Sequence, residues 1–329
     1  MPGKATVLVV GGAGYIGSQT VKQLARAGYN PVTVDNLVHG HRDAVVAGAF
    51  EQGDCADAAF LKGVFSRHSI QAVMHFAAFA SVGESVKDPA KYYENNVAAT
   101  LTLLKSMPEA GVDKLIFSST CAIYGEPSRI PLTEDHPQRP LSPYGTSKWM
   151  VEQIFQDFYR AYGLRTIAFR YFNAAGADPD GDIGERNDPE THLIPLVFDA
   201  IRTGAPLKIF GDDYPTPDGT CIRDYIHVVD LARAHILGLE QLLSGKPSTA
   251  YNLGNGQGYS VREVIQAAEK VSGKPVPREI APRRPGDPAV LIGSAQKAIT
   301  ELGWRPSFSN IEQIIETAWR FYVTKGRKS

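Results

Sequence analysis

A tyrosine, a lysine and a threonine are placed where they could carry out proton transfer. Tyr144 and Lys148 are four residues apart, a spacing that puts both side chains on one face of a helix. A nearby ammonium stabilises a phenolate, so Lys148 should lower the pKa of Tyr144 and make it a general base. Thr120 follows an apolar run, and its hydroxyl could donate a hydrogen bond to a substrate oxygen. The Tyr–Lys spacing alone is also common on helix surfaces.

A glycine-rich segment near the N-terminus has the pattern of a dinucleotide-binding loop. It follows an apolar run, precedes a helical pattern and fits both GxGxxG and GxxGxxG, with glycines at Gly11, Gly12, Gly14 and Gly17. Such glycines let the backbone approach a pyrophosphate, and the N-terminal amides of the helix stabilise its charge. Asp35 comes 18 residues (35 − 17) after Gly17, where an acid is expected to bind ribose hydroxyls. A carboxylate there repels a 2′-phosphate, which favours NAD over NADP.

The elements that must hold these residues alternate along the first half of the chain. Short apolar runs predict buried strands at Thr6–Val10, Pro31–Asp35, Ala72–Phe76, Lys114–Ser118 and Thr166–Arg170. Amphipathic stretches predict helices at Ile16–Ala27, Ala58–Arg67, Ala90–Met107 and Ser147–Ala161. This alternation indicates an α/β protein with a Rossmann-type, doubly wound parallel sheet of six or seven strands.

The composition of the chain changes after about Gly176, where Asp, Gly and Pro become frequent and the predicted helices and strands become shorter. We therefore expect an NAD-binding Rossmann domain over residues 1–176 and a smaller C-terminal substrate-binding lobe over residues 177–329. The stretch 225–245 reads as a strand followed by a helix, and we expect it to return to the first domain.

Composition favours small-molecule chemistry. The net charge is −1 and no basic stripe is present, so neither a nucleic acid nor a membrane is expected as a partner. The first residues lack the pattern of a signal peptide, and no stretch has the length of a membrane span. Three cysteines without metal-ligand spacing indicate a reduced, cytoplasmic protein without a metal.

Taken together, these motifs and several longer strings resemble the extended short-chain dehydrogenase/reductase family, and within it the nucleotide-sugar 4-epimerases. The resemblance covers essentially the whole chain. Strings such as Val82–Ser85 and Arg223–Val228 are far more specific than either short motif. The segments that carry it are Gly11–Gly17, Asp35–Leu37, Gly53–Asp54, His75–Val97, Phe117–Gly125, Ser142–Glu152, Arg170–Gly176, Asp212–Asp230, Tyr251–Gly254 and Ala281–Asp287.

The resemblance implies roles for individual residues. The catalytic set is Thr120, Tyr144 and Lys148, with threonine where serine is common. The residues implied to contact NAD, besides Tyr144 and Lys148, are Gly11, Gly14, Tyr15, Ile16, Gly17, Asp35, Asn36, Asp54, Cys55, Phe76, Ala77, Ala78, Asn95 and Phe172. Several relatives have a lysine at the position of Ala80, so one cofactor contact is missing here.

A third set of residues is implied to hold a UDP-sugar. Besides Thr120 and Tyr144, it consists of Asn173, His192, Leu193, Lys208, Phe210, Arg223, Arg284 and Asp287. The arginines suit this task because a guanidinium pairs bidentately with phosphate oxygens. His192 stands where asparagine is frequent, and its alternative interpretation is a surface residue at the start of a helix.

The implied activity is the interconversion of UDP-glucose and UDP-galactose. The sugar is oxidised at C4 to a 4-keto form, rotates, and is reduced again by tightly bound NADH, so NAD is regenerated in each turnover. A 4,6-dehydratase would need an Asp–Glu pair after Thr120, where this chain has Cys121 and Ala122. A non-catalytic NAD-binding regulator would not need the catalytic set. The family also implies a homodimer.

The sugar itself is left open by these motifs, which UDP-xylose/UDP-arabinose and UDP-N-acetylhexosamine 4-epimerases share. Leu291 aligns with a position whose bulk helps decide whether an N-acetyl group fits. Tyrosine stands there in relatives with a narrow site and cysteine in tolerant ones. Leucine is intermediate, so we expect hexose use, with tolerance of an N-acetyl group undecided.

Overall fold

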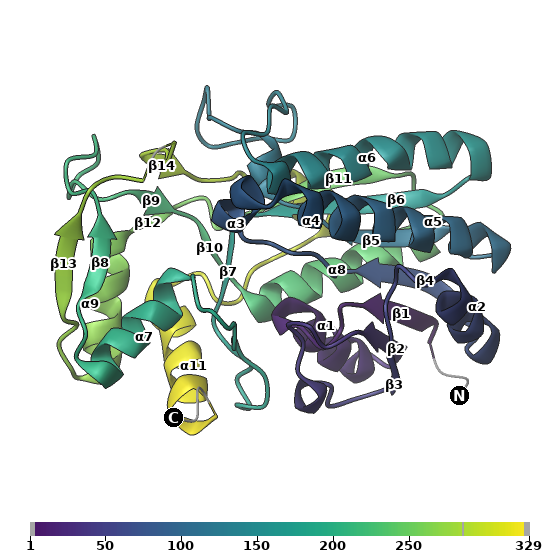
Figure 1. Ribbon diagram of the computed structural model, residues 1–329, viewed down its shortest axis with the longest axis horizontal. Coiled ribbons are helices and arrows are strands. Elements are labelled where there is room, and N and C mark those ends of the chain that lie inside the picture. Colours follow the sequence, from purple (N-terminus) through teal and green to yellow (C-terminus); the bar gives the residue numbers. More distant parts are fainter. Residues whose placement is uncertain (1–3, 285, 326–329) are drawn as a thin grey trace.

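The computed structural model describes residues 4–284 and 286–325 and is built around one large parallel β-sheet (Figure 1). Its strand order is β11-β6-β5-β4-β1-β2-β3, and every neighbouring pair is parallel. This order confirms the predicted doubly wound, Rossmann-type sheet. The strands are β1 (Thr6–Val10), β2 (Asn30–Asp35), β3 (Ala49–Gln52), β4 (Ile70–His75), β5 (Lys114–Ser118), β6 (Arg165–Tyr171) and β11 (Thr249–Leu253).

Alternate side chains of the strands build two hydrophobic cores, one on each face of the sheet. In β1, Val7 and Val9 belong to one core, whereas Leu8 and Val10 belong to the other, as the two-residue period of a strand requires. Two groups of helices cover the two faces of the sheet. They are α1 (Tyr15–Arg26) and α8 (Val228–Leu243) on one face, and α2 (Ala58–Arg67), α5 (Ala99–Glu109) and α6 (Pro143–Tyr162) on the other.

The helix predicted over Ala90–Met107 is not continuous. It is divided into α4 (Pro89–Tyr93), a π-helical turn at Glu94–Ala98 and α5. Asn96 lies in this turn, and its side chain bonds both the N–H and the C=O of Phe79, each at 3.0 Å. These hydrogen bonds join Asn96 to a residue 17 positions earlier in the chain. The apolar periodicity of the predicted helix therefore does not reveal the π-helical turn. Shorter helical elements in this lobe are η1 (Arg42–Ala44), α3 (Val82–Lys87) and η3 (Cys121–Ile123).

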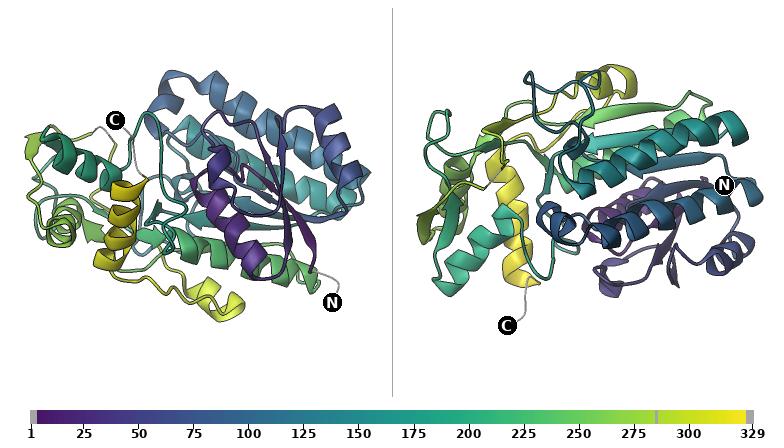
Figure 2. Two further views of the ribbon diagram at one scale, coloured as in Figure 1. Left: turned by 90° about the horizontal axis from the view of Figure 1, so that it is seen from below. Right: turned by 45° about the horizontal axis from the view of Figure 1, so that its top comes forward.

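A smaller second lobe lies beside one end of the sheet in each view (Figures 1 and 2). It is held by a third core between α7, α9, α11 and β8. Its elements are β7 (Asn173–Ala175), α7 (Leu193–Thr203), β8 (Leu207–Phe210), β9 (Ile222–Arg223), β10 (Tyr225–His227), β12 (Tyr259–Ser260), α9 (Val261–Ser272), β13 (Arg278–Ala281), β14 (Val290–Leu291) and α11 (Ile311–Thr324).

The chain returns to the large sheet after the second lobe has begun. Strand β10 pairs with β7 outside that sheet, but α8, which follows it directly, packs on β5 and β6. Strand β11 then pairs with β6 at the edge of the sheet, and α10 (Gln296–Leu302) packs on β11. The expected domain limits at residues 176 and 225–245 remain a prediction, and β11 is a further segment that belongs to the sheet.

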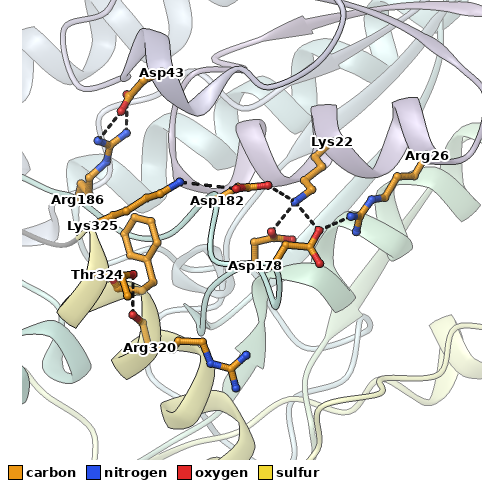
Figure 3. A network of polar contacts seen from close by, with 11 residues as sticks. Lys22, Arg26, Asp43, Asp178, Asp182, Arg186, Arg320, Thr324 and Lys325 are labelled. Carbon is orange, nitrogen blue, oxygen red and sulfur yellow. Dashed lines mark hydrogen bonds and ion pairs between the residues drawn. The ribbon is translucent and has the colours of Figure 1, made fainter.

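A cluster of charged side chains joins the two lobes (Figure 3). Lys22, buried on α1, reaches the loop that follows Gly176 and places its ammonium 2.5 Å from Asp178, 2.8 Å from Asp180 and 2.9 Å from Asp182. Asp178 is completely buried, and a buried carboxylate requires such a partner. The three acids are close enough to surround a cation, and the ammonium of Lys22 supplies that charge.

Within residues 4–284 and 286–325, no helix is long and apolar enough to cross a membrane.

Candidate active site

Thr120 and Tyr144 meet where a strand ends and a helix begins. Thr120 lies just beyond β5, and its hydroxyl accepts a hydrogen bond of 3.1 Å from the N–H of Ala122. Pro143 and the N-cap Ser142 start α6, so Tyr144 lies in the first turn of the helix, an arrangement that suits proline. The hydroxyl of Thr120 lies close enough to that of Tyr144 to lower its pKa. The structure therefore brings together two of the three predicted catalytic residues.

Lys148 lies one turn further along α6 and is almost completely buried. Its ammonium donates a hydrogen bond of 2.8 Å to the carbonyl oxygen of Ser118, at the end of β5. It also lies 4.7 Å from the centre of the Phe117 ring, where the face of the ring attracts a cation. The side chain of Lys148 is thus fixed by the same strand end that carries Thr120.

The pKa values of this pair differ from the expectation. Burial raises the pKa of Tyr144 to about 12, and the nearby hydroxyl of Thr120 offsets only part of this increase. Burial likewise lowers the pKa of Lys148 to about 7. The predicted lowering of the pKa of Tyr144 is not found in this site, because desolvation dominates that pKa and the ammonium of Lys148 is directed at the carbonyl of Ser118.

The glycine loop packs so tightly that side chains have no room in it. A Cβ atom on Gly17 would lie 2.1 Å from the carbonyl oxygen of Gly11, and one on Gly11 would lie 2.5 Å from the N–H nitrogen of Ala77. Gly14 is the N-cap of α1, no side chain caps the helix there, and its first turn holds no acid. The amides at this end of α1 thus remain available to an anion.

A cavity of about 120 Å³ opens beside the glycine loop, at the carboxyl ends of the sheet strands. This position and the uncapped end of α1 fit an extended dinucleotide diphosphate. The predicted cofactor residues that line it are Gly11, Gly14, Asp35, Asn36, Asp54, Cys55, Phe76, Ala77, Ala78 and Asn95. A shallower hollow of about 410 Å³ adjoins the cavity and shares Asp54, Phe79 and Asn95 with it.

Asp35 is held firmly at the edge of this cavity. Its carboxylate accepts backbone hydrogen bonds from Ala13 at 2.9 Å and from Leu37 at 2.8 Å. Leu37 has a φ of 63°, a left-handed conformation that is uncommon for leucine. It turns the chain back towards the cavity directly after β2. The carboxylate is therefore oriented before any ribose hydroxyl arrives.

Sequence reasoning missed seven residues that line the cavity in addition to the predicted ones: Val10, Val34, Val38, His39, Gly40, Gly53 and Phe79. Three of them lie in the turn after Asp35, and the ring of His39 packs edge-on against Phe79 with centroids 5.4 Å apart. The one feature of the sequence that could have placed Gly40 at the cavity is its position five residues after Asp35. A Cβ on Gly40 would lie only 2.6 Å from the Asp35 carboxylate.

The other predicted cofactor residues lie outside this cavity. Tyr144 and Lys148 are in the catalytic set, and Gly17 and Ile16 follow the loop within α1. The hydroxyl of Tyr15 donates a hydrogen bond of 2.5 Å to the carbonyl of Gly176, where the second lobe begins. Phe172 packs in the apolar cluster around Cys121, Tyr124 and Leu132.

Several predicted substrate residues gather in the second lobe. The guanidinium of Arg284 lies 4.0 Å from the centre of the Phe210 ring, and the side chains of Arg223 and Asp287 form an ion pair. The amide of Asn173 donates a hydrogen bond of 2.9 Å to the carbonyl of Asp224. Two arginines and an aromatic ring in one region can bind phosphate oxygens and stack on a flat base.

The side chains of His192 and Lys208 are exposed. The imidazole of His192 pairs with Glu185, whose charge is the main reason that the pKa of His192 rises to about 9. Leu193, the next residue, begins α7. The ammonium of Lys208 lies 4.0 Å from Glu279 on the neighbouring strand β13.

Comparison with known proteins fits this site. The model of the NAD dependent epimerase/dehydratase family matches residues 7–254, which include the glycine loop, Thr120, Tyr144 and Lys148. The chain belongs to the NAD dependent epimerase/dehydratase family. It is 52% identical to UDP-glucose 4-epimerase of Lacticaseibacillus casei over 96% of both chains. It is 51% identical to UDP-glucose 4-epimerase of Rhizobium meliloti over 98% of both chains.

Solved structures of the NAD dependent epimerase/dehydratase family have the same fold. UDP-glucose 4-epimerase from Brucella ovis in complex with NAD superposes with a TM-score of 0.94, at 50% identity over 96% of this chain and 98% of that chain. UDP-glucose 4-epimerase from Bifidobacterium longum in complex with NAD+ and UDP gives a TM-score of 0.92, at 40% identity over 98% of this chain and 99% of that chain.

Proposed function

We propose that this protein is a UDP-glucose 4-epimerase, an NAD-dependent isomerase that interconverts UDP-glucose and UDP-galactose. The observation that carries the proposal is the assembly of Thr120, Tyr144 and Lys148 at the end of β5, in a chain about half identical to such enzymes along its whole length. Cys121 and Ala122 lie where a 4,6-dehydratase needs acids. Burial raises the pKa of the Cys121 thiol to about 12, so it cannot act as one.

The cofactor is NAD, held tightly and regenerated in each turnover. The amides at the start of α1 would bind the pyrophosphate, Asp35 would accept the hydroxyls of the adenosine ribose, and Asp54 would lie near the adenine. When bound there, NAD would supply the acceptor, and then the donor, of the hydride exchanged at C4 of the sugar, so the reaction would have no net redox change. The remaining predicted cofactor contacts, Tyr15, Ile16, Gly17 and Phe172, are part of the same proposal.

Tyr144 is the proposed acid and base of the reaction. Its phenolate removes the proton from the 4-hydroxyl of the sugar, assisted by the hydroxyl of Thr120, and returns it in the reverse step. Burial opposes the phenolate, since it raises the pKa of Tyr144 to about 12. The ammonium of Lys148 and the positive charge of the oxidised cofactor favour the phenolate. Tyr144 is therefore expected to be ionised when the cofactor is bound.

The second lobe is proposed to hold the UDP group while the sugar rotates. Arg223 and Arg284 would pair with the diphosphate, and Phe210 would contribute its ring. Since Arg223 already pairs with Asp287, the carboxylate orients the guanidinium towards the diphosphate. The other proposed substrate contacts are Asn173, His192, Leu193 and Lys208.

The proposed activity has a direct test. The purified protein, incubated with UDP-galactose and no added NAD, should form UDP-glucose, because the cofactor is carried by the protein. The same assay with UDP-N-acetylgalactosamine and UDP-xylose measures sugar preference. Release of water from the sugar, or accumulation of NADH in proportion to substrate, would contradict the epimerase assignment. A preference for UDP-xylose would change the substrate and leave the reaction type in place.

Leu291 is the residue on which the sugar preference is proposed to depend. It lies on β14 and packs in the cluster that contains Cys121 and Tyr124, next to the catalytic Thr120. Leucine is smaller than tyrosine and larger than cysteine, so hexoses should be accepted. The assay with UDP-N-acetylgalactosamine decides whether a bulkier 2-substituent fits.

A homodimer in the cytoplasm is the proposed state of the protein. Helices α5 and α6 expose apolar side chains at Leu101, Met150 and Tyr159, which a second copy of the chain could cover. All three cysteines are free thiols, as expected in a reducing compartment. Sedimentation equilibrium should give twice the chain mass of 35.7 kDa. A single-chain mass at micromolar concentration would contradict the dimer.

A further inference from the structure

Three consecutive residues at the end of β5 each face a different residue of α6. The carbonyl of Ser118 accepts a hydrogen bond of 2.8 Å from Lys148. The hydroxyl of Ser119 donates one of 2.5 Å to Glu152, and the hydroxyl of Thr120 lies close enough to that of Tyr144 to lower its pKa. The three helix residues are four positions apart and so lie on one face of α6. Glu152 is the member of this series that the proposed reaction does not use.

The carboxylate of Glu152 is buried and fixed from two sides. Arg170 on β6 binds it with two nitrogens, Nε at 3.1 Å from Oε1 and an Nη at 2.5 Å from Oε2. Such a bidentate pair fixes both the position and the plane of a carboxylate. The third nitrogen of the guanidinium, its other Nη, donates to the hydroxyl of Tyr124 at 3.0 Å. Glu152 is therefore a rigid support for the hydroxyl of Ser119.

Two cations share the negative charge of Glu152. Arg170 binds Glu152 directly. The negative charge of Glu152 also raises the pKa of Lys148, against the effect of burial. The histidine and the two tyrosines nearby bring no charge at neutral pH. Burial lowers the pKa of His75 on β4 to about 3 and raises the pKa values of Tyr124 and of Tyr171 on β6. The carboxylate of Glu134 is bound to the N–H of Asn252, and its carbonyl accepts from Arg170.

We propose that Glu152 is a positioning residue of the reaction: through Ser119 it holds Thr120 against α6, and its charge keeps Lys148 an ammonium. The proposal rests on the proposed function, in which Lys148 acts as a cation. Glu152 touches neither substrate nor cofactor in this proposal. Its loss should therefore lower kcat and change the pH dependence of the reaction, with little effect on KM.

Removal of the charge is tested with Glu152→Gln. Activity that requires the Lys148 ammonium is present below the pKa of Lys148 and disappears as the pH rises through it. Without the opposite charge this pKa falls further, so the alkaline limb of the kcat profile should move to lower pH by about one unit. At a pH above the limb, kcat should fall about tenfold. Asp157→Asn is the matched control, because Asp157 is an exposed acid on the same helix.

Removal of the contact is tested with Glu152→Asp and Ser119→Ala. Aspartate keeps the charge but is too short to reach Ser119, and Ser119→Ala deletes the hydroxyl alone. Both variants should lower kcat at every pH, with the alkaline limb and KM unchanged. An unshifted limb in Glu152→Gln, or wild-type kcat in both contact variants, would overturn the proposal. If Glu152→Gln fails to fold, these two variants still decide the contact.

Failure of this proposal is distinguishable from failure of the proposed function. Every profile is measured against the wild-type protein with UDP-galactose. A wild-type protein without epimerase activity refutes the function, whatever the variants do. An active wild-type protein whose Glu152 and Ser119 variants behave like Asp157→Asn refutes the role of Glu152 alone.

Discussion

Replacement of Tyr144 by phenylalanine is expected to lower kcat by about 10²–10⁴-fold, the usual contribution of a general acid or base. The phenol is the group that exchanges a proton with the sugar in the proposed reaction, and phenylalanine preserves the ring but not the hydroxyl. The ring packs edge-on against Tyr92, with centroids 6.5 Å apart, so the fold should persist. Initial rates with UDP-galactose and the NAD content of the purified variant measure the two effects.

The control for this variant is Tyr159→Phe, on the same helix. Tyr159 is exposed, so loss of its hydroxyl should leave kcat and NAD content unchanged. A Tyr144→Phe protein with the wild-type rate would show that another group transfers the proton. A slow variant that has also lost its NAD would show that the phenol mainly binds cofactor.

Replacement of Gly17 by alanine is expected to reduce the NAD content of the purified protein at least tenfold. The new methyl group would lie 2.1 Å from the carbonyl oxygen of Gly11 and 2.9 Å from the Cα of Gly12. Both atoms belong to the backbone of the loop, so the loop itself must shift away from α1. A forced shift of this kind costs about 1–3 kcal/mol, and the displaced amides no longer face the pyrophosphate.

Gly83→Ala is the matched control for Gly17→Ala. A Cβ at Gly83 meets nothing within 4 Å, and Gly83 lies in helix α3, where alanine is the better helix former. The cofactor content of each protein is read from the absorbance of NAD released on denaturation. Equimolar NAD in Gly17→Ala would mean that the loop accommodates a side chain and that its close packing does not determine cofactor binding.

The strands of the large sheet could be predicted because each strand is marked by a pattern of neighbouring residues in the sequence. Parallel strands covered on both faces appear as continuous apolar runs, and the run Lys114–Ser118 coincides with β5. The π-helical turn at Asn96 could not be predicted, since the hydrogen bonds of its side chain go to Phe79, 17 residues earlier in the chain. Strand β11 was missed because it pairs with β6, about 80 residues before it.

Some residues of the candidate site could likewise be predicted from local patterns, and others could not. Glycine spacing and the four-residue separation of Tyr144 and Lys148 are local patterns, and the structure places these residues beside Asp35 and Thr120 as expected. Phe79 reaches the cavity from another strand end, and its sequence context carries no sign of this. The pKa of Tyr144 was misjudged because neighbouring residues reveal a charge, whereas the depth of burial depends on the whole fold.

Lys22 also bears on how quickly the two lobes can come apart. Its ammonium is shared by three carboxylates of the loop after Gly176, and the same loop binds Tyr15 at the start of α1. An open form that separates Lys22 from Asp178 would have to break all three ion pairs together, so the closed form is favoured. Ligands that leave only through such an opening would stay for many catalytic cycles, a kinetic barrier suited to a cofactor that is reused.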